Sequence, residues 1–227
     1  MDKDRVKRLA AEAALAKLPP EGLIGLGTGT TARHFILAVA ELVRAGKKYV
    51  GVATSEQSRS IAVAAGLPLR DDAGPWDVAV CVDGADEVSA ELDIIKGGGG
   101  AHTREKIVNF AARLNVIVVD ESKLSQKLGE RWAVPVEVLP FGHCETAKLM
   151  QAYGKPALRL RDGAPFRTDS GNYVYDVATG PIDEPQALHL ALKTIPGVVE
   201  TGLFCGRADV VLVARESGIE ELSRKAR

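Results

Sequence analysis

Short apolar runs alternate with amphipathic segments over roughly the first half of the chain. The apolar runs are bounded by glycines or polar residues, which predicts β-strands. These strands are expected at residues 23–26, 49–52, 76–82 and 115–119. Apolar spacing and end signals predict helices at residues 3–18, 30–45, 55–65 and 103–114. The alternation indicates an α/β fold: a Rossmann-like, doubly wound, mostly parallel sheet with helices between its strands.

The pattern changes near residue 130, where the order of elements becomes strand, helix, strand, strand, helix, strand. Strands are expected at residues 134–139, 157–160, 173–177 and 198–204, and helices at 143–153 and 184–195. This order is a split βαβ, so the segment is predicted as a small α+β (ferredoxin-like) domain. A further apolar strand at 209–214 is expected to rejoin the first sheet. The predicted division is a catalytic domain of residues 1–129 plus 203–227, interrupted by an inserted lid or oligomerisation domain of residues 130–202.

Charge and composition narrow the function classes. The 227 residues hold 29 Lys plus Arg and 30 Asp plus Glu, so the net charge is −1, and only 5% are aromatic. A nucleic-acid partner is not expected without a basic field or stacking platforms. No apolar run reaches the roughly 20 residues that span a bilayer, so no membrane association is expected. The three cysteines are far apart in the sequence, which favours a reducing, cytoplasmic location.

Two glycine-rich segments are candidates for binding an anion. The first, Gly25–Ala32, follows a predicted strand and opens a helix, an arrangement that points free amides and the positive helix end at a phosphate. A tight turn without ligand is the alternative. The segment also fits GxGxxA, a form of the dinucleotide fingerprint, but the second strand ends Ala53-Thr54-Ser55. The expected ribose-binding acid is therefore missing, and Glu56 arrives only in the next helix.

An acidic run, Asp83-Gly84-Ala85-Asp86-Glu87, follows the third predicted strand. Ligands of parallel sheets bind beyond the carboxyl ends of the strands, so Asp83 and Asp86 are candidates for holding sugar hydroxyls, moving protons or binding magnesium. A solvated loop whose aspartates cap the next element is the alternative.

The second glycine-rich segment, Lys96–Ala101, is costly to order and predicts close backbone approach to a ligand, with a flexible linker as the alternative. Glu105 follows in the first turn of a predicted helix. The apolar stripe of Ile107, Phe110, Ala111 and Leu114 is expected to face the core, which leaves Glu105 roughly opposite. Glu105 is then either a carboxylate base at a cleft or a residue that complements the helix dipole.

These motifs together resemble ribose-5-phosphate isomerase type A over nearly the whole chain. The segments that carry the resemblance are Gly25–Thr31, Asp83–Glu87, Lys96–Gly99, Thr103–Lys106, Pro135–Val138, Thr168–Asn172 and Ile195–Phe204. Each is weak alone, and their common order and spacing is specific. Departures are small: Thr30 stands where serine is frequent, and His102 where an apolar residue is expected.

The resemblance implies an aldose–ketose isomerase that interconverts D-ribose 5-phosphate and D-ribulose 5-phosphate in the pentose phosphate pathway, without cofactor or metal. It implies that Glu105 is the base and that Asp83, Asp86 and Lys96 are polar catalytic groups. Further substrate-binding residues implied are Thr28, Gly29, Thr30, Thr31, Gly84, Ala85, Gly97, Gly98, Gly99, Lys123 and Lys7. Family members are dimers or tetramers, so a homodimer is expected and a homotetramer is the alternative.

Three other functions fit parts of the sequence. A NAD-dependent oxidoreductase would use the turn at Gly27 but leaves Asp83 and Lys96 without a role. A non-catalytic sugar-phosphate sensor has no need of Glu105. An acyl-CoA transferase on a similar fold would need a nucleophilic glutamate that is not evident.

Overall fold

The computed structural model describes residues 3–224, with side chains from residue 7 onward. Spatial contacts divide the chain into two units. The first runs to Ala85 and includes Arg104–Lys123 and the chain from Arg207; the second comprises Asp86–Thr103 and Leu124–Gly206. The second unit thus contains the segment 130–202 expected as an insertion, and also the glycine-rich segment that sequence analysis placed in the catalytic domain. The predicted division into a domain of residues 1–129 plus 203–227 and a domain of residues 130–202 stays a prediction.

The first unit is built on a six-stranded sheet in the order β15-β14-β6-β3-β1-β2. All neighbouring pairs are parallel except β14 with β15, which confirms the doubly wound, mostly parallel sheet. The strands are β1 (Gly22–Leu26), β2 (Tyr49–Ala53), β3 (Val78–Asp83), β6 (Ala112–Asp120), β14 (Val210–Arg215) and β15 (Gly218–Ser223). Sequence analysis missed β15 because it is an exposed edge strand without a buried apolar run.

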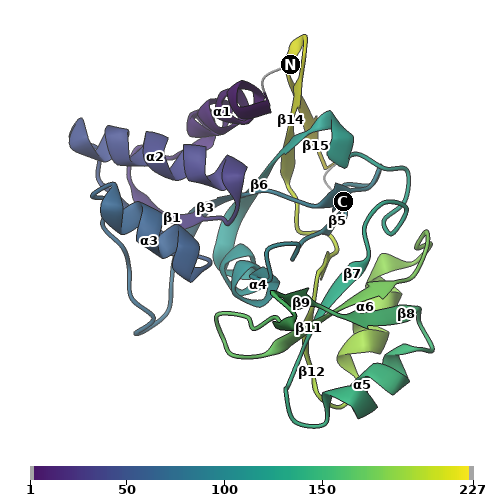
Figure 1. Cartoon of the computed structure of the whole chain (residues 1–227). Coiled ribbons are helices and arrows are strands. Elements are labelled where there is room, and N and C mark those ends of the chain that lie inside the picture. Colours follow the sequence, from purple (N-terminus) through teal and green to yellow (C-terminus); the bar gives the residue numbers. More distant parts are fainter. Residues whose placement is uncertain (1–2, 225–227) are drawn as a thin grey trace. The chain divides into compact units, whose positions relative to one another are not determined.

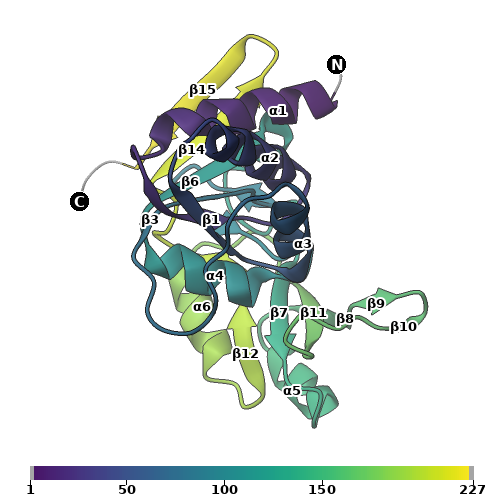
Figure 2. The same cartoon turned by 90° about the vertical axis from the view of Figure 1, so that its left-hand side faces the viewer.

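Helices cover both faces of this sheet. One face packs against α1 (Lys3–Ala14), α2 (Thr30–Arg44) and α3 (Glu56–Ala64), whose buried side chains join those of β1, β3, β6 and β14 in one apolar cluster. In Figures 1 and 2, α1 and α2 lie side by side on that face. On the other face Val108 of α4 (His102–Ala111) packs against Val52 and Cys81. Within the described residues, none of the helices combines the length and the hydropathy that a membrane-spanning helix needs.

The second unit contains a four-stranded antiparallel sheet in the order β12-β7-β11-β8. Its elements, in chain order, are β7 (Val134–Val138), α5 (His143–Met150), β8 (Lys155–Leu158), β11 (Tyr173–Ala178), α6 (Pro185–Lys193) and β12 (Val198–Thr201). This is the predicted split βαβ. A small hairpin was not predicted: β9 (Leu160–Arg161) with β10 (Ala164–Pro165), which projects in Figure 2. A three-stranded sheet joins β4 (Glu87–Val88), β5 (Ile94–Ile95) and β13 (Leu203–Phe204). Of these strands β4 was not predicted, whereas β5 lies in the strand-like segment 92–95 before the second glycine-rich segment and β13 in the predicted strand 198–204.

The two faces of this antiparallel sheet pack against different parts of the second unit. Val136 and Val138 pack with Met150 of α5 and Leu192 of α6 in one apolar cluster. Side chains alternate along a strand, so Glu137, like Pro135, points to the opposite face. The backbone around the second glycine-rich segment lies on that opposite face. A Cβ at Gly97 would lie 3.0 Å from the Pro135 Cβ, and the Lys96 amide donates to the Gly202 carbonyl at 2.9 Å. We call this the platform face.

The predicted apolar stripe of α4 is wrong. Ile107 and Phe110 are 55% and 60% exposed, whereas Glu105 is 5% and Val108 is 2% exposed. Leu114 lies not in the helix but in β6, where it pairs with Val80. Periodicity equates the buried face of a helix with its apolar face. This helix instead buries polar side chains, so the predicted buried and exposed faces are exchanged. Glu105, expected outside the core, is buried.

Candidate functional site

Four loops meet at the carboxyl edge of the first sheet. Because β1, β2, β3 and β6 are parallel, the segments that follow them lie along one edge. Those segments contain residues 27–31, 54–58, 83–85 and 120–123. The strands β1, β3 and β6 are adjacent in the sheet. The first glycine-rich segment therefore lies next to Asp83, and Asp83 next to the segment that contains Lys123. Lys123 is partly exposed in a short 3₁₀ turn, η2 (Glu121–Lys123).

Two helices begin at this edge, and their N-termini differ. Ser55 caps α3, and its hydroxyl accepts from the Ser58 amide at 3.1 Å. In α2 the cap position is Gly29, whose φ of 102° lies where side chains are rarely found, and no described side chain caps the helix. Thr30 and Thr31, which open α2, are exposed and partly exposed. The start of α2 is thus suited to an anion that accepts from its first amides.

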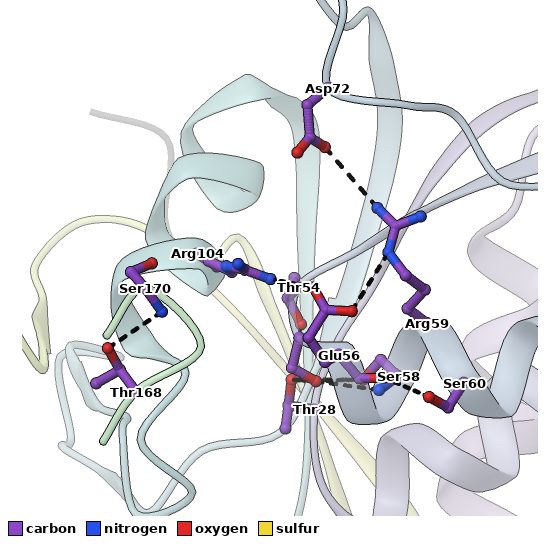
Figure 3. Close-up of polar contacts among 11 residues, drawn as sticks. Thr28, Thr54, Glu56, Ser58, Arg59, Ser60, Asp72, Arg104, Thr168 and Ser170 are labelled. Carbon is purple, nitrogen blue, oxygen red and sulfur yellow. Dashed lines mark hydrogen bonds and ion pairs between the residues drawn. The ribbon is translucent and has the colours of Figure 1, made fainter. Parts of the chain in front are cut away.

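Neutral hydroxyls hold the backbone before α2 in place. The Thr28 hydroxyl contacts those of Thr54 at 2.8 Å and Ser55 at 2.9 Å, and the Ser58 hydroxyl donates to the Gly27 carbonyl at 2.6 Å. Figure 3 shows Thr28 beside Thr54 and Ser58. Sequence analysis noted the Thr54-Ser55 end of β2 only for its missing acid. Its hydroxyl-rich composition was the available signal for this support.

Asp83 is bound directly to the first glycine-rich segment. It is 4% exposed, and its Oδ1 accepts from the Thr28 amide at 3.0 Å and from the Gly84 amide at 2.7 Å. Gly27 must be glycine here, since a Cβ would lie 2.6 Å from the Asp83 Cα and closer still to its carboxylate. The predicted binding turn and the first predicted aspartate therefore form one hydrogen-bonded assembly.

Glu56 and Arg104 make an ion pair next to this assembly. The Arg104 guanidinium donates to Glu56 Oε1 at 2.7 Å, which holds the pKa of Glu56 below its ordinary value of 4.5. The Glu56 side chain is 57% exposed, so the pair is largely solvated. Its carboxylate is thus engaged by Arg104 (Figure 3).

The second glycine-rich segment carries the predicted residues Lys96 and Gly97–Gly99, and Asp86 is bonded to it; all of these lie in the second unit. Asp86 Oδ2 accepts from the Gly98 amide at 2.7 Å, and the Gly100 amide donates to the Gly97 carbonyl at 2.9 Å. Two of the amides expected to bind an anion are therefore used within the chain. Lys96 is 4% exposed, and its ammonium lies 5.9 Å from the centre of the Phe204 ring.

Arg159 is a contact of this segment that sequence analysis missed. Its guanidinium binds Asp176 in a two-pronged ion pair, at 3.0 Å and 2.5 Å. It also donates to the carbonyls of Gly97 at 2.8 Å and Gly98 at 3.2 Å. Phe166 lies under the guanidinium and would collide with any Cβ at Gly100. No local pattern around Arg159 signals this role, because the glycine carbonyls that it binds are more than 60 residues away in sequence.

The other predicted residues are placed as follows. Glu105 lies in the first turn of α4 and is buried. Lys7 is partly exposed on α1 and forms no hydrogen bond or ion pair with the described residues. The described part of the chain contains no group of three or more His, Cys, Asp or Glu side chains arranged to hold a metal ion.

A parallel sheet with an uncapped helix N-terminus and buried acids at its carboxyl edge is typical of α/β enzymes acting on small anionic substrates. The sequence model of "ribose 5-phosphate isomerase A (phosphoriboisomerase A)" matches residues 50–218. Ribose-5-phosphate isomerase A of Gloeobacter violaceus is 45% identical, with 100% of this chain and 99% of the relative covered. The chain therefore belongs to the ribose-5-phosphate isomerase A family, as the sequence motifs predict.

Solved structures agree with this assignment. The isomerase of Methanocaldococcus jannaschii is 38% identical, with a TM-score of 0.92 over 98% of this chain and 100% of that one. A D-ribose-5-phosphate isomerase solved in complex with phospho-erythronic acid is 36% identical, with a TM-score of 0.95 over 99% and 100%. The fold class and the class of enzyme, an isomerase, are confirmed.

Proposed function

We propose that this chain interconverts D-ribose 5-phosphate and D-ribulose 5-phosphate, in the non-oxidative branch of the pentose phosphate pathway, with Glu105 as the general base. Family membership supports the reaction, and the related enzyme bound to phospho-erythronic acid supports a phosphorylated sugar acid or sugar as ligand. The observation that carries the base assignment is the position of Glu105. It is 5% exposed, at the start of a helix, within the Thr103–Lys106 motif.

The chemistry needs a base, a means to hold a negative oxygen and an anchor for the phosphate. From the open-chain aldose, Glu105 takes the proton from C2 and returns it to C1, while the hydroxyl proton passes from O2 to O1. Asp83, Asp86 and Lys96 assist ring opening and the transfer of hydroxyl protons, and the Lys96 ammonium stabilises the enediolate oxygen. Neither a cofactor nor a metal takes part.

The phosphate is assigned to the start of α2, with Thr28 to Thr31 around it. The open cap position at Gly29 supports this, because it leaves the first amides of α2 to an anion. Phosphate bound away from the reacting carbons supplies binding energy that positions them. Lys123, partly exposed after β6, and Lys7 are proposed as further phosphate ligands; Gly84, Ala85 and Gly97–Gly99 are proposed to border the sugar.

Isomerisation of ribose 5-phosphate in EDTA tests the proposal. The wild-type chain is expected to be active, and Glu105→Gln to lose about 10² or more in kcat, as expected for removal of a general base. Glu41→Gln, an exposed glutamate of α2, is the control and keeps full rate. A Glu105→Gln rate near that of the wild type removes the base assignment. A wild type that needs added metal contradicts the metal-free mechanism, and stabilisation by NAD but not by ribose 5-phosphate contradicts the isomerase.

The assembly is proposed to be a homodimer, with a homotetramer as the alternative. Large apolar side chains are exposed on both units, which supports an interface: Ile107 and Phe110 on α4, and Leu139, Phe141 and Leu149 on the second unit. The three cysteines form no disulfide within the described residues, and Cys144 is exposed, which supports a cytoplasmic location. Sedimentation equilibrium measures the assembly, and a monomer at micromolar concentration contradicts it.

A further inference from the structure

Side chains from three of the sequence motifs converge on one buried carboxylate that the proposed mechanism does not use. Glu137 of β7 is 1% exposed and points to the platform face. Its Oε2 accepts from the Thr103 hydroxyl at 2.5 Å. Its Oε1 accepts from the Thr168 hydroxyl at 2.9 Å and from the side-chain amide of Asn172 at 2.8 Å. The segments Pro135–Val138, Thr168–Asn172 and Thr103–Lys106 therefore meet at Glu137.

A carboxylate in this position is costly. Among the described residues, every hydrogen bond to Glu137 comes from a neutral group and no cation pairs with it. Burial of a charge with neutral partners must be offset entirely by those hydrogen bonds, and an apolar side chain would fill a strand at lower cost. The chain thus retains Glu137 at a position where stability alone favours another residue.

One of its partners belongs to the helix that carries the proposed base. Thr103 is the second residue of α4, and Glu105 follows two residues later in the same turn. At the other end of α4, Arg207 donates to the Asn109 side chain at 3.0 Å and to its carbonyl at 2.6 Å. Since a helix moves as a stiff rod, two anchored ends fix its direction and its rotation. Loss of the Thr103 anchor weakens the hold on the end that contains Glu105, to which the Arg104–Glu56 pair also contributes.

We propose that Glu137 is a positioning residue, which holds the first turn of α4 through Thr103 and thereby sets the orientation of the Glu105 carboxylate. The hydrogen bond of Thr103 to Glu137 also holds the chain just beyond the second glycine-rich segment, three residues after Gly100. This inference rests on the proposed role of Glu105 as the base. Displacement of a catalytic group by about 1 Å can lower the rate 10²-fold. Partial release of one anchor is therefore expected to slow proton transfer about tenfold, with little change in substrate binding.

Variants at Thr103 test the link without removing the buried charge. Thr103→Val keeps the shape and loses the hydroxyl, and Thr103→Ser keeps the hydroxyl. Thr146→Val is the matched control, because Thr146 is a buried threonine of the same unit whose hydroxyl donates to the Pro196 carbonyl at 2.9 Å. Kinetics are measured with ribose 5-phosphate and with its C2-deuterated form. The deuterium isotope effect reports how far proton removal limits the rate.

The expected result is a tenfold lower kcat for Thr103→Val, a KM within twofold of the wild type and a larger isotope effect. Thr103→Ser and Thr146→Val are expected to keep kcat and the isotope effect, even where their melting temperatures fall. Glu137→Gln is expected to change kcat and the isotope effect as Thr103→Val does. The double variant with both Thr103→Val and Glu137→Gln is expected to be no slower than the slower single variant.

A wild-type kcat and isotope effect in Thr103→Val overturns the inference, as does an equal loss in Thr146→Val. Failure of the proposed function is distinguishable, since it would appear as an inactive wild type or a fully active Glu105→Gln. If Glu137→Gln does not fold, the Thr103 variants still decide the question.

Discussion

The two glycine-rich segments are supported by different kinds of contact. The first, around Gly27, is held by neutral hydroxyls of Thr54, Ser55 and Ser58 together with the Asp83 carboxylate. The second, around Gly98, is held by charged groups, namely Asp86 and the Arg159–Asp176 pair. The first also lies against strands of its own sheet, whereas the second spans four consecutive glycines on the platform face.

The difference follows from what each segment has to do. A phosphate carries its own charge, and hydroxyl supports add no charge to the field of the α2 amides; the one carboxylate, Asp83, binds the Thr28 amide before the helix begins. Four glycines lose a large conformational entropy on ordering, and charge-assisted hydrogen bonds help to offset that loss. The first segment is therefore held mostly by hydroxyls with one carboxylate, and the second by a carboxylate and an arginine–aspartate pair.

The largest expected effect on stability comes from adding a methyl group to a glycine of each segment, because the added group contacts different atoms in the two segments. Gly27→Ala brings a Cβ against the Asp83 backbone, 2.6 Å from its Cα, and is expected to cost about 3 kcal/mol of unfolding free energy. Gly98→Ala meets only the Asp86 carboxylate, at 2.7 to 3.1 Å, which can rotate, so about 1 kcal/mol is expected. Urea unfolding measures both, and equal losses contradict the comparison.

The second prediction breaks the charged support. Arg159→Ala removes the donors to the carbonyls of Gly97 and Gly98 and is expected to lower kcat/KM about tenfold, since a hydrogen bond to a charged group is worth about 1.5–3 kcal/mol. Arg159→Lys is expected to recover only part, because one ammonium cannot bind Asp176 with two prongs and also reach two carbonyls. Arg44→Ala, an exposed arginine of α2, is the control. Full recovery in Arg159→Lys would show that charge alone matters.

Sequence patterns were sufficient for elements that follow local rules. Apolar runs gave the strands of both sheets except the exposed edge strand β15, and glycine and proline signals gave the helix ends to within a few residues. The inverted face of α4 shows where such rules end, because this helix buries Glu105 and other polar side chains while Ile107 and Phe110 are exposed. Arg159 and Glu137 show the same for side chains. Their partners are distant in sequence, so their hydrogen bonds follow from the fold and not from spacing.

A smaller effect is expected where the support is neutral. Ser58→Ala removes the hydroxyl that donates to the Gly27 carbonyl and is expected to cost about 1 kcal/mol in stability. KM for ribose 5-phosphate is expected to rise about threefold, with kcat unchanged, because the turn is proposed to bind phosphate and not the reacting carbons. Ser60→Ala is the control on the same helix, since its exposed hydroxyl donates only to the Glu56 carbonyl (Figure 3). A fall in kcat with KM unchanged would contradict this division of roles.

The smallest effect concerns the ion pair of Arg104 with Glu56 beside the first segment. The hydrogen bond from Arg104 lowers the pKa of Glu56, so the pair stabilises the fold above the unfolded pKa, and this stability is lost as the pH falls through the lowered folded value. Because the Glu56 side chain is 57% exposed, Glu56→Gln is expected to cost no more than about 0.5 kcal/mol at pH 7. The difference from the wild type should vanish on acidification below pH 4.5, the ordinary pKa of this carboxyl group. Urea unfolding across this range measures the effect. A cost well above 1 kcal/mol at pH 7, or one that persists in acid, would contradict the view that the Arg104–Glu56 pair is a minor, solvated support of the first segment.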